Sequence, residues 1–348
     1  MADKFGPLVR LWGFDKSQLP ERTATVEELT PLLTSLLLEA APFIASIPPA
    51  QNAVAESAWK PKGIKTFPHS TAPVDIYERV VPAQDLQALA DRSQPPQLVG
   101  VTKVPAEHWF MRRSTHEDKP AEGTASWDEW VRNFKEEHAE SEKQFTRTII
   151  RTEVLREWDC SGTEVDLDGH VWSDWTLKLE QSTHKMPTPL KPRLFPVLQA
   201  TASSTHRREF IVVQVAFRDR DLESQGSPEH VRGSYTSIER LREVDEGRSI
   251  EWVMATTSDA KGVLPAWVQR PAMPGAVSKD VDMFLNWAAK QRQAQDGVNS
   301  KNGSAQKAGP AANLNGDENG DADKKREEPV GVGEAGTEGQ VPAQAQTT

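Results

Sequence analysis

Residues 235–287 have the sequence YTSIERLREVDEGRSIEWVMATTSDAKGVLPAWVQRPAMPGAVSKDVDMFLNW and contain the most informative pattern in the chain. Two strand-like runs come first, a crossing interrupted by Gly and Pro follows, and an amphipathic helix ends the segment. A curved antiparallel sheet that closes around a long helix ends in this order. Such a sheet leaves an apolar cavity beside the helix, so the pattern favours a ligand-binding protein over a catalyst.

The two strand-like runs predict a hairpin over residues 231–244 and 249–257, because Gly247 supplies the positive φ that tight turns need. A two-residue loop at Glu246-Gly247 pairs Leu241 with Trp252. It places these residues on one face: Tyr235, Ser237, Glu239, Trp252, Met254 and Thr256. A three-residue loop would instead put Ile238 and Arg240 beside Met254 and Trp252.

Four further strands are predicted before the hairpin. Trp175, Leu177 and Leu179 alternate with polar residues, which is typical of a strand with one buried face. Residues 194–202 and 209–217 predict a strand pair, and the second strand is apolar on both faces and therefore central. Residues 145–158 are rich in Thr, Ile and Val and favour a strand.

Three helices are predicted from spacing and capping. Residues 32–44 have apolar side chains at helical spacing and follow Thr30 and Pro31, which suit a helix start. Ser126 and Glu129 form a capping box, which predicts a helix over residues 127–142. The last helix is expected over residues 278–293, with Ser278 as its cap and an inward face of Val281, Phe284, Leu285 and Ala288.

Composition limits the function classes. The net charge of -10 in 348 residues argues against a nucleic-acid-binding body, which needs clustered Lys and Arg. A single cysteine, Cys160, cannot form an internal disulfide, and the N-terminus lacks the apolar core of a secretory signal, so we expect a cytoplasmic protein. Residues 294–348 contain no aromatic residue and are expected to form a disordered acidic tail with unknown partners.

The usual catalytic and cofactor motifs are missing from the sequence. The eight histidines show no metal-binding spacing, and there is no Walker A loop, no GxGxxG after a strand and no GxSxG elbow. Cys160 follows Asp159, which disfavours a thiolate nucleophile. We therefore predict no metal, no cofactor and no enzymatic activity.

Three segments resemble a START-related family of uncharacterised function that is common in fungi: WFMRRSTHEDKPAEGTASWDEW from Trp109, IEWVMATTSDAKGVLPAW from Ile250 and PGAVSKDVDMFLNW from Pro274. The element order also resembles the wider START (steroidogenic-acute-regulatory-related lipid transfer) and Bet v 1-like helix-grip superfamily. The resemblance implies an α+β helix-grip fold: a curved antiparallel sheet around a long C-terminal helix. Residues 1–60 would then be a helical extension packed on the body, 61–293 the START-like domain and 294–348 the tail.

The resemblance further implies an apolar ligand, such as a sterol or phospholipid, held between the sheet and the last helix, and transient contact with a membrane. In the two-residue-loop register Trp252 and Met254 form a wall and Tyr235 and Glu239 act as polar anchors. The candidate cavity residues are the hairpin face together with Trp175, Leu177, Phe284 and Leu285.

Three alternatives remain open at this point. In the first alternative, Trp252 and Met254 are core residues without a ligand, and Glu239 pairs with an arginine on another strand. The second is a cyclase- or hydrolase-like enzyme that uses Glu239 or Tyr235 in the same cavity. The third is an interaction protein that acts through its acidic tail.

Overall fold

The computed structural model describes residues 7–48, 57–262 and 270–305. The chain divides into two units, residues 1–299 and 300–348, and the sheet belongs to the first. The strands are β1 (Phe14–Asp15), β2 (Lys60–Lys65), β3 (Val74–Val81), β4 (Glu107–Glu117), β5 (Ile149–Trp158), β6 (Val165–Leu167), β7 (His170–His184), β8 (Arg193–Ser204), β9 (Glu209–Arg218), β10 (Val231–Arg232), β11 (Ser234–Val244) and β12 (Ser249–Asp259).

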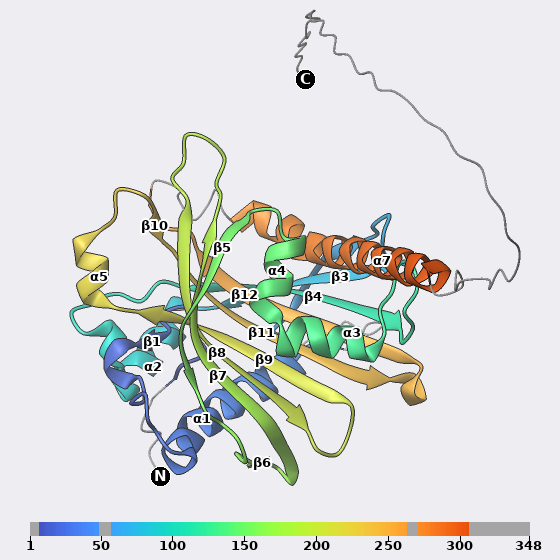
Figure 1. The fold of residues 1–348 in the computed structure, drawn as a ribbon. Helices are drawn as coiled ribbons and strands as arrows, with labels where there is room; N and C mark the ends of the chain where they lie inside the picture. The colour runs from blue at the N-terminus through green and yellow to red at the C-terminus, as the bar shows by residue number, and fades with distance from the viewer. Residues whose placement is uncertain (1–6, 49–56, 263–269, 306–348) are drawn as a thin grey trace, which may run out of the picture. The chain divides into compact units, whose positions relative to one another are not determined.

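These strands form a 12-stranded sheet whose main path runs β2-β3-β4-β12-β11-β9-β8-β7-β5. Every neighbouring pair along the path is antiparallel. The strands change direction strongly from β3 and β4 to β5 and β7, as right-handed strand twist requires (Figure 1). The predicted pairing of residues 194–202 with 209–217 is confirmed, and β9 is buried on both faces in the middle of the sheet.

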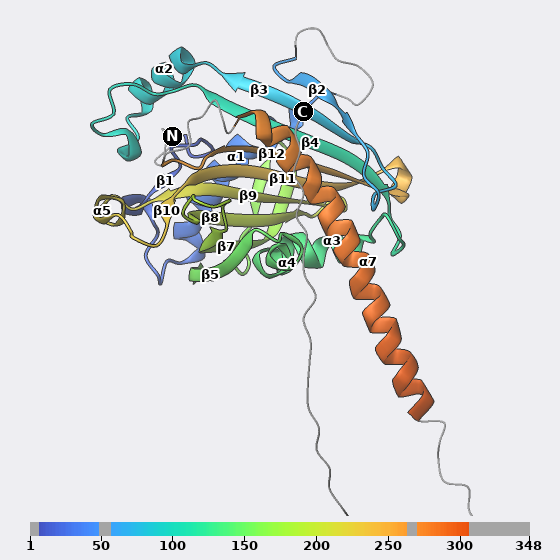
Figure 2. The same ribbon diagram turned by 90° about the horizontal axis from the view of Figure 1, so that it is seen from above.

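The helices lie on both sides of this sheet. They are α1 (Val26–Ala45), α2 (Ala83–Ser93), α3 (Trp127–Val131), α4 (His138–Phe145), α5 (Arg220–Gln225) and α7 (Met273–Ala305), with short turns η1 (Lys16–Gln18), η2 (Pro96–Leu98), η3 (Arg132–Glu136), η4 (Asp245–Gly247) and η5 (Arg270–Ala272). Figure 2 shows α7 crossing β12 and β11 while α1 lies behind the strands. The predicted helix-grip architecture is confirmed by this arrangement.

The register predicted with a two-residue loop is confirmed, but the loop itself contains four residues, 245–248, and the first strand of the hairpin begins at Ser234. Leu241 pairs with Trp252, Glu239 with Met254 and Ser237 with Thr256. The turn itself is the short helical segment η4, in which Glu246 and Gly247 both have positive φ. Gly247 adopts this conformation without the penalty that a Cβ would add.

The two larger hydrophobic clusters of the described residues lie on the two sides of the sheet, and a small third cluster joins Trp12 to Leu86, Ala90 and Val104. The α1-side core joins α1 to strand residues such as Leu177, Leu198 and Val213. The α7-side core joins Phe284 and Leu285 of α7 to side chains from α3, α4 and the hairpin strands. The sheet therefore separates two apolar interiors that share no side chains.

α1 contributes one face to the α1-side core, with Leu29, Leu33, Leu36 and Ile44 almost completely buried. The helix is long and apolar enough by length and composition to cross a membrane, but half of its apolar window is buried inside the protein. A helix that covers a sheet has the same composition, so the hydropathy of α1 is weak evidence for a membrane span.

The predicted helix over residues 127–142 is divided. Its capping box is present, with both Ser126 and Glu129 engaged, but α3 ends at Val131 and a π-helical turn follows. Glu137 has non-helical φ and ψ, and α4 begins after it. The predicted strand over residues 145–158 begins only at Ile149, because Phe145 is the last residue of α4.

The last helix is longer than predicted. α7 begins at Met273, so Ser278 lies inside it and donates a hydrogen bond to the Pro274 carbonyl at 2.8 Å instead of capping the helix. The predicted inward face of Val281, Phe284, Leu285 and Ala288 is confirmed by burial. α7 also continues past residue 294 to Ala305. The rest of the predicted tail, and residues 263–269 of the Gly/Pro crossing, lie outside the described residues.

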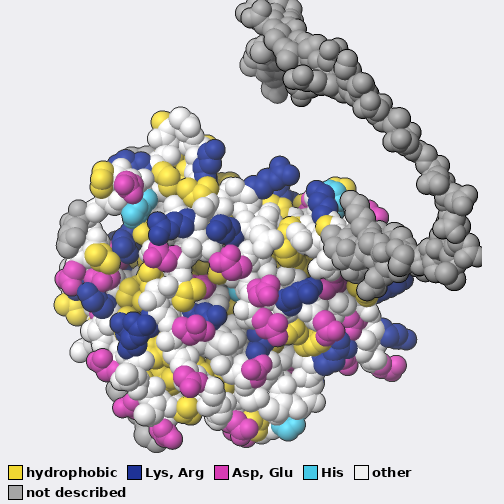
Figure 3. All heavy atoms as spheres, in the orientation of Figure 1, with side chains coloured by type: hydrophobic (Ala, Val, Ile, Leu, Met, Phe, Trp, Pro, Cys, Tyr) yellow, Lys and Arg dark blue, Asp and Glu magenta, His cyan; other side chains and the backbone are white. Residues whose placement is uncertain are grey.

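Charged side chains of both signs are interspersed on the face shown in Figure 3, and on that face Lys and Arg do not gather into one large patch. Mixed charge of this kind gives no continuous track for a phosphate backbone. The visible face therefore offers no support for nucleic-acid binding.

Candidate functional site

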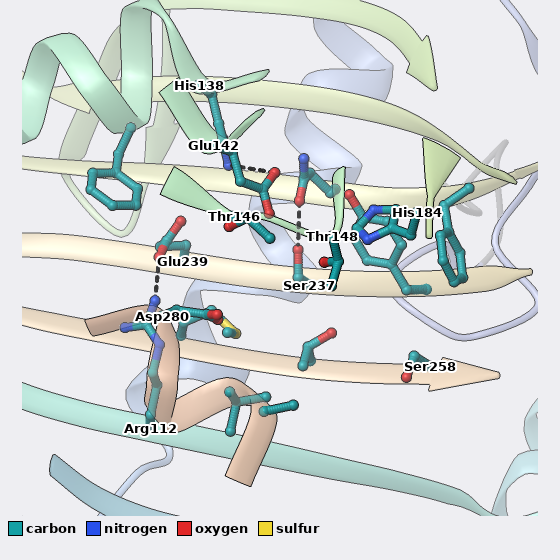
Figure 4. A pocket seen from close by; sticks show the side chains of 18 of the residues that line it. Arg112, His138, Glu142, Thr146, Thr148, His184, Ser237, Glu239, Ser258 and Asp280 are labelled. Atoms are coloured by element: carbon teal, nitrogen blue, oxygen red, sulfur yellow. Dashed lines mark hydrogen bonds and ion pairs between the residues drawn. The ribbon is translucent and has the colours of Figure 1, made fainter. Parts of the chain in front are cut away.

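A cavity of about 320 Å³ lies between the hairpin strands, α4 and the start of α7. Its apolar wall is made by Phe134, Phe145, Phe195, Trp252, Met254 and Val277. Its polar wall includes Arg112, Glu142, Gln214, Tyr235, Glu239 and Asp280 (Figure 4). The cavity therefore presents a large apolar surface and several charged groups to the same small volume.

The hairpin supplies six of the candidate residues. Tyr235, Ser237 and Glu239 of β11 and Trp252, Met254 and Thr256 of β12 all line the cavity. The strand register causes this, because cross-strand partners on one face of an antiparallel pair lie side by side.

Four other candidates do not line the cavity. Trp175 and Leu177 belong to the α1-side core, so their placement in the cavity was wrong. Period-two alternation shows that one face of a strand is buried but not which side of the sheet that face covers. Phe284 and Leu285 face inward as expected, but both are packed in the α7-side core beside the cavity.

A buried ion pair occupies one end of the cavity. Arg112 on β4 donates through Nη2 to Glu239 Oε1 at 3.1 Å, and the Trp252 indole N–H donates to the same oxygen at 2.5 Å. The Arg112 guanidinium carbon lies 3.7 Å from the centroid of a Trp252 ring, within cation–π range. Glu239 thus has an arginine partner on another strand and still faces the cavity.

Arg112 is not fully satisfied by these contacts. Only 2% of its side chain is exposed, and its Nε and Nη1 atoms are buried without a hydrogen-bond partner. Burial lowers the pKa of Arg112, although Glu239 opposes this effect. Since buried polar groups are nearly always hydrogen-bonded, the free donor atoms indicate a place for an acceptor that the protein itself does not provide.

Two further carboxyl groups face the same space from two helices. Burial, together with the charges of Asp280, Glu239 and Glu180, raises the pKa of Glu142 to about 8. Burial, opposed by Arg112, raises the pKa of Asp280 to about 7. Both groups therefore change protonation near neutral pH.

The neighbouring rings add no charge to the cavity near pH 7. Burial lowers the pKa of His138, which lies 3.9 Å from Glu142 Oε2, and lowers that of His184 to about 4. Burial and the nearby carboxylates raise the pKa of Tyr235 well above its ordinary value. Both imidazoles and the phenol are consequently neutral there.

A short hydrogen-bond chain crosses the floor of the cavity. Ser237 donates to Gln214 Oε1 at 2.9 Å, and Gln214 donates to Gln199 Oε1 at 3.0 Å. Gln214 also lies 3.5 Å from Glu180, whose pKa burial raises to about 7. These groups bond to one another and fix the shape of the floor.

The cavity reaches the surface between two connections of the chain. Thr148, before β5, and Ala276, near the start of α7, both line it and are both exposed. Ser258 and Met273 also line a second hollow of about 130 Å³. The start of α7 therefore separates the cavity from solvent.

Within the described ranges, no group of three or more His, Cys, Asp or Glu side chains is arranged to hold a metal ion. Cys160 is buried in the α1-side core, and burial followed by the Asp159 charge raises the pKa of its thiol to about 11. A thiol with such a pKa stays protonated near neutral pH and is a poor nucleophile.

A family model described as "Protein of unknown function (DUF3074)" matches residues 109–288, more than half of the chain, and the protein belongs to this family. The matched region contains the cavity strands β4, β11 and β12. No curated protein sequence matches the chain.

Solved structures with similar folds include the human StAR-related lipid transfer protein 5, with 12% identity, 77% of this chain and 99% of that chain covered, and a TM-score of 0.47. Human STARD10 is 13% identical, the match covers 72% of this chain and 83% of that chain, and the TM-score is 0.44. The lipid transfer and protein localization domain of human StarD13 has 12% identity, 72% and 95% coverage and a TM-score of 0.39.

Proposed function

We propose that the protein binds one apolar or amphipathic small molecule in the cavity and holds it without chemical change. The observation that supports this most directly is the combination of a wall of aromatic and methionine side chains with buried donor atoms of Arg112 that have no partner. Ligand-binding sites combine a mostly apolar surface with a few polar groups that orient the ligand.

The volume of the cavity favours a small ligand. At about 320 Å³ it lies at the lower end of the roughly 300–1,000 Å³ that is typical of ligand sites. A sterol or a single-chain lipid is therefore a better candidate than a phospholipid with two chains. Uptake from a membrane surface and residence in the cytoplasm are further parts of this proposal.

The geometry gives little support to catalysis by the residues named from the sequence. Glu239 Oε1 already accepts hydrogen bonds from Arg112 and Trp252, so it is poorly placed to take a proton from a substrate. The raised pKa of Tyr235 makes its phenolate inaccessible near neutral pH.

A second candidate function rests on Glu142. A carboxyl with a pKa of about 8 in a cavity is suited to general acid–base catalysis. The test is to incubate the ligand that co-purifies with the protein with wild type and with Glu142→Gln, then to compare its mass. An unchanged mass in both samples rejects the enzyme.

Native mass spectrometry of the purified protein, before and after organic extraction, tests the binding proposal. We expect a bound mass that extraction removes and that the Ala276→Trp variant loses, because the indole would obstruct the opening. Lys279→Trp is the matched control, since Lys279 is an exposed α7 residue that does not line the cavity. The proposal is wrong if wild type has no bound mass and binds nothing in a sterol and single-chain lipid panel.

A further inference from the structure

Acidic side chains outnumber basic ones in the lining of the cavity. Glu142, Glu239 and Asp280 line it, whereas Arg112 is the only Lys or Arg among the described lining residues. Arg112 already pairs with Glu239 at 3.1 Å. Among the described lining residues, no Lys or Arg is therefore left to pair with Glu142 of α4 or Asp280 of α7.

The surrounding groups do not correct this imbalance. The titratable side chains that face Glu142 are His138 on the same helix, Glu180 and His184 on β7, Tyr235 and Glu239 on β11, Arg112 on β4 and Asp280 on α7. The two histidines and the tyrosine are neutral near pH 7, as argued above, and Glu180 adds a further acid behind Gln214. Carboxylates that share one cavity repel one another, so each of them favours the protonated form of the others.

The carboxyl groups remain accessible from within the cavity. The Glu142 side chain keeps 34% of its surface accessible and lines the cavity, and Asp280 is half-buried. Figure 4 shows Glu142, Glu239 and Asp280 pointing into a common space from three different elements. A ligand atom in that space would contact more than one of them.

The free donor atoms of Arg112 provide a second, independent constraint. Its Nε and Nη1 are buried without a partner, and so is Nδ1 of His138, which also lines the cavity. The two arginine atoms call for an oxygen acceptor close to the carboxyl groups. An anionic acceptor such as a phosphate would add charge of the same sign as that on Glu239 and on the ionised forms of Glu142 and Asp280, so a neutral hydroxyl oxygen fits better.

From these two constraints we propose that the cavity binds an amino alcohol with an apolar chain: a protonated nitrogen lies between Glu142 and Asp280, and a hydroxyl oxygen beside it accepts from Arg112. The apolar chain then extends along Phe145, Phe195 and Met254. Aromatic side chains around a cation add attraction through their ring faces. This proposal rests on the proposed function, since it names the chemical class of the ligand for the same cavity.

Calorimetric titration with five probes that share one chain length tests the proposal: N-dodecylethanolamine, dodecyltrimethylammonium, dodecanol, dodecanoate and dodecylphosphocholine, each below its micelle concentration. We expect N-dodecylethanolamine to bind tightest at neutral pH, by about ten-fold over dodecanol, because a charge-assisted contact replaces a neutral one. Dodecanoate is expected to bind weakest, because it adds an acidic group to a cavity that already contains Glu142, Glu239 and Asp280.

The pH dependence of the affinity for N-dodecylethanolamine is a second test of the proposal. The probe amine stays protonated from about pH 6 to pH 8, while the fraction of ionised Glu142 rises about fifty-fold over that interval for a pKa of about 8. The affinity for N-dodecylethanolamine should rise with pH by up to that factor. Binding should release protons, which calorimetry in two buffers of different ionisation enthalpy measures.

Glu142→Gln removes the charge but keeps the shape of the side chain. We expect it to lower the affinity for N-dodecylethanolamine by about ten-fold relative to the affinity for dodecanol, and dodecanol binding also shows that the variant is folded. Asp280→Asn should act in the same direction. Glu140→Gln, an exposed position on the same helix, is the matched control.

The outcomes separate the two proposals. If dodecanol or dodecanoate binds as tightly as N-dodecylethanolamine, or if binding takes up protons, the cavity binds lipids but the amino-alcohol proposal is wrong. Tighter binding of dodecylphosphocholine would also overturn it and would indicate an anionic acceptor. If none of the probes binds, the amino-alcohol proposal is wrong, and the bound mass and the sterol panel then decide the binding proposal separately.

Discussion

Replacing Glu142 by glutamine probes the electrostatics of the cavity without changing its shape. Burial and neighbouring carboxylates raise the pKa of this carboxyl from an ordinary 4.5 to about 8 in the folded protein. The folded state therefore binds the proton more tightly than the unfolded chain does. Wild type should lose stability as the pH rises from about 4.5 to about 8, whereas the glutamine variant lacks this loss.

The size of the effect follows from the same comparison. At about 1.36 kcal/mol per pH unit, the difference between 4.5 and about 8 corresponds to at most about 5 kcal/mol. Because 34% of the Glu142 side chain is accessible, water in the cavity screens the charge, and we expect roughly 1–2 kcal/mol. That is a rise of about 2–8 °C in the midpoint of thermal unfolding.

Thermal unfolding followed by circular dichroism at about pH 5 and about pH 8.5 measures the gain in stability of Glu142→Gln over wild type. Glu142→Gln should exceed wild type at the higher pH and differ much less at the lower pH, while the exposed control Glu140→Gln should match wild type at both. Equal midpoints for wild type and Glu142→Gln at about pH 8.5 would refute the electrostatic argument. A gain at that pH would show that Glu142 costs stability in the empty protein, as functional residues often do.

Three further predictions concern the packing around the cavity. Arg112→Met leaves Glu239 buried without its cation and should lower the free energy of unfolding, measured in urea, by about 3–5 kcal/mol. The Arg112→Met/Glu239→Gln double variant should recover most of this stability. Additive losses in the two single variants and the double variant would show that the pair is not coupled. Trp175→Ala should lower the free energy of unfolding by about 3–5 kcal/mol but leave ligand affinity unchanged, because Trp175 lies in the α1-side core. Weaker binding by a fully folded variant would contradict that placement. Gly233→Ala would place a Cβ 2.2 Å from the Phe195 ring. We therefore expect the free energy of unfolding in urea to fall by about 1–3 kcal/mol and ligand binding to weaken. A variant with unchanged stability and binding would show that the ring moves freely.

The sequence predicted the hairpin well because its information is local. Gly247 tolerates the positive φ of the turn, and the turn then determines every cross-strand pair from Ser237 to Thr256. The helix-grip order of elements also follows from local patterns. The break at Glu137 was not predictable in this way, since nothing in the capping box of α3 indicates where the helix ends.

Three charged residues of the cavity, Arg112, Glu142 and Asp280, were missed because charge alone usually indicates a solvated position. A usable signal was present in two of them. Asp280 stands three residues after Val277 and four before Phe284, and Glu142 stands four after His138 and three before Phe145, so both lie on inward helix faces. Arg112 gave no such signal, because its partner Glu239 is distant in the sequence and only strand pairing brings them together.

The separation of the two apolar interiors by the sheet has a consequence for local opening of the protein. The α7-side core contains the inward residues Phe284 and Leu285, whereas α1 and most of the central strands are held by the other core. Local opening can therefore release the start of α7 as a subglobal unit while the strands keep their hydrogen bonds. Amide hydrogen exchange should accordingly be faster in α7 than in α1, and the proposed ligand would then enter and leave on a timescale that is independent of global unfolding.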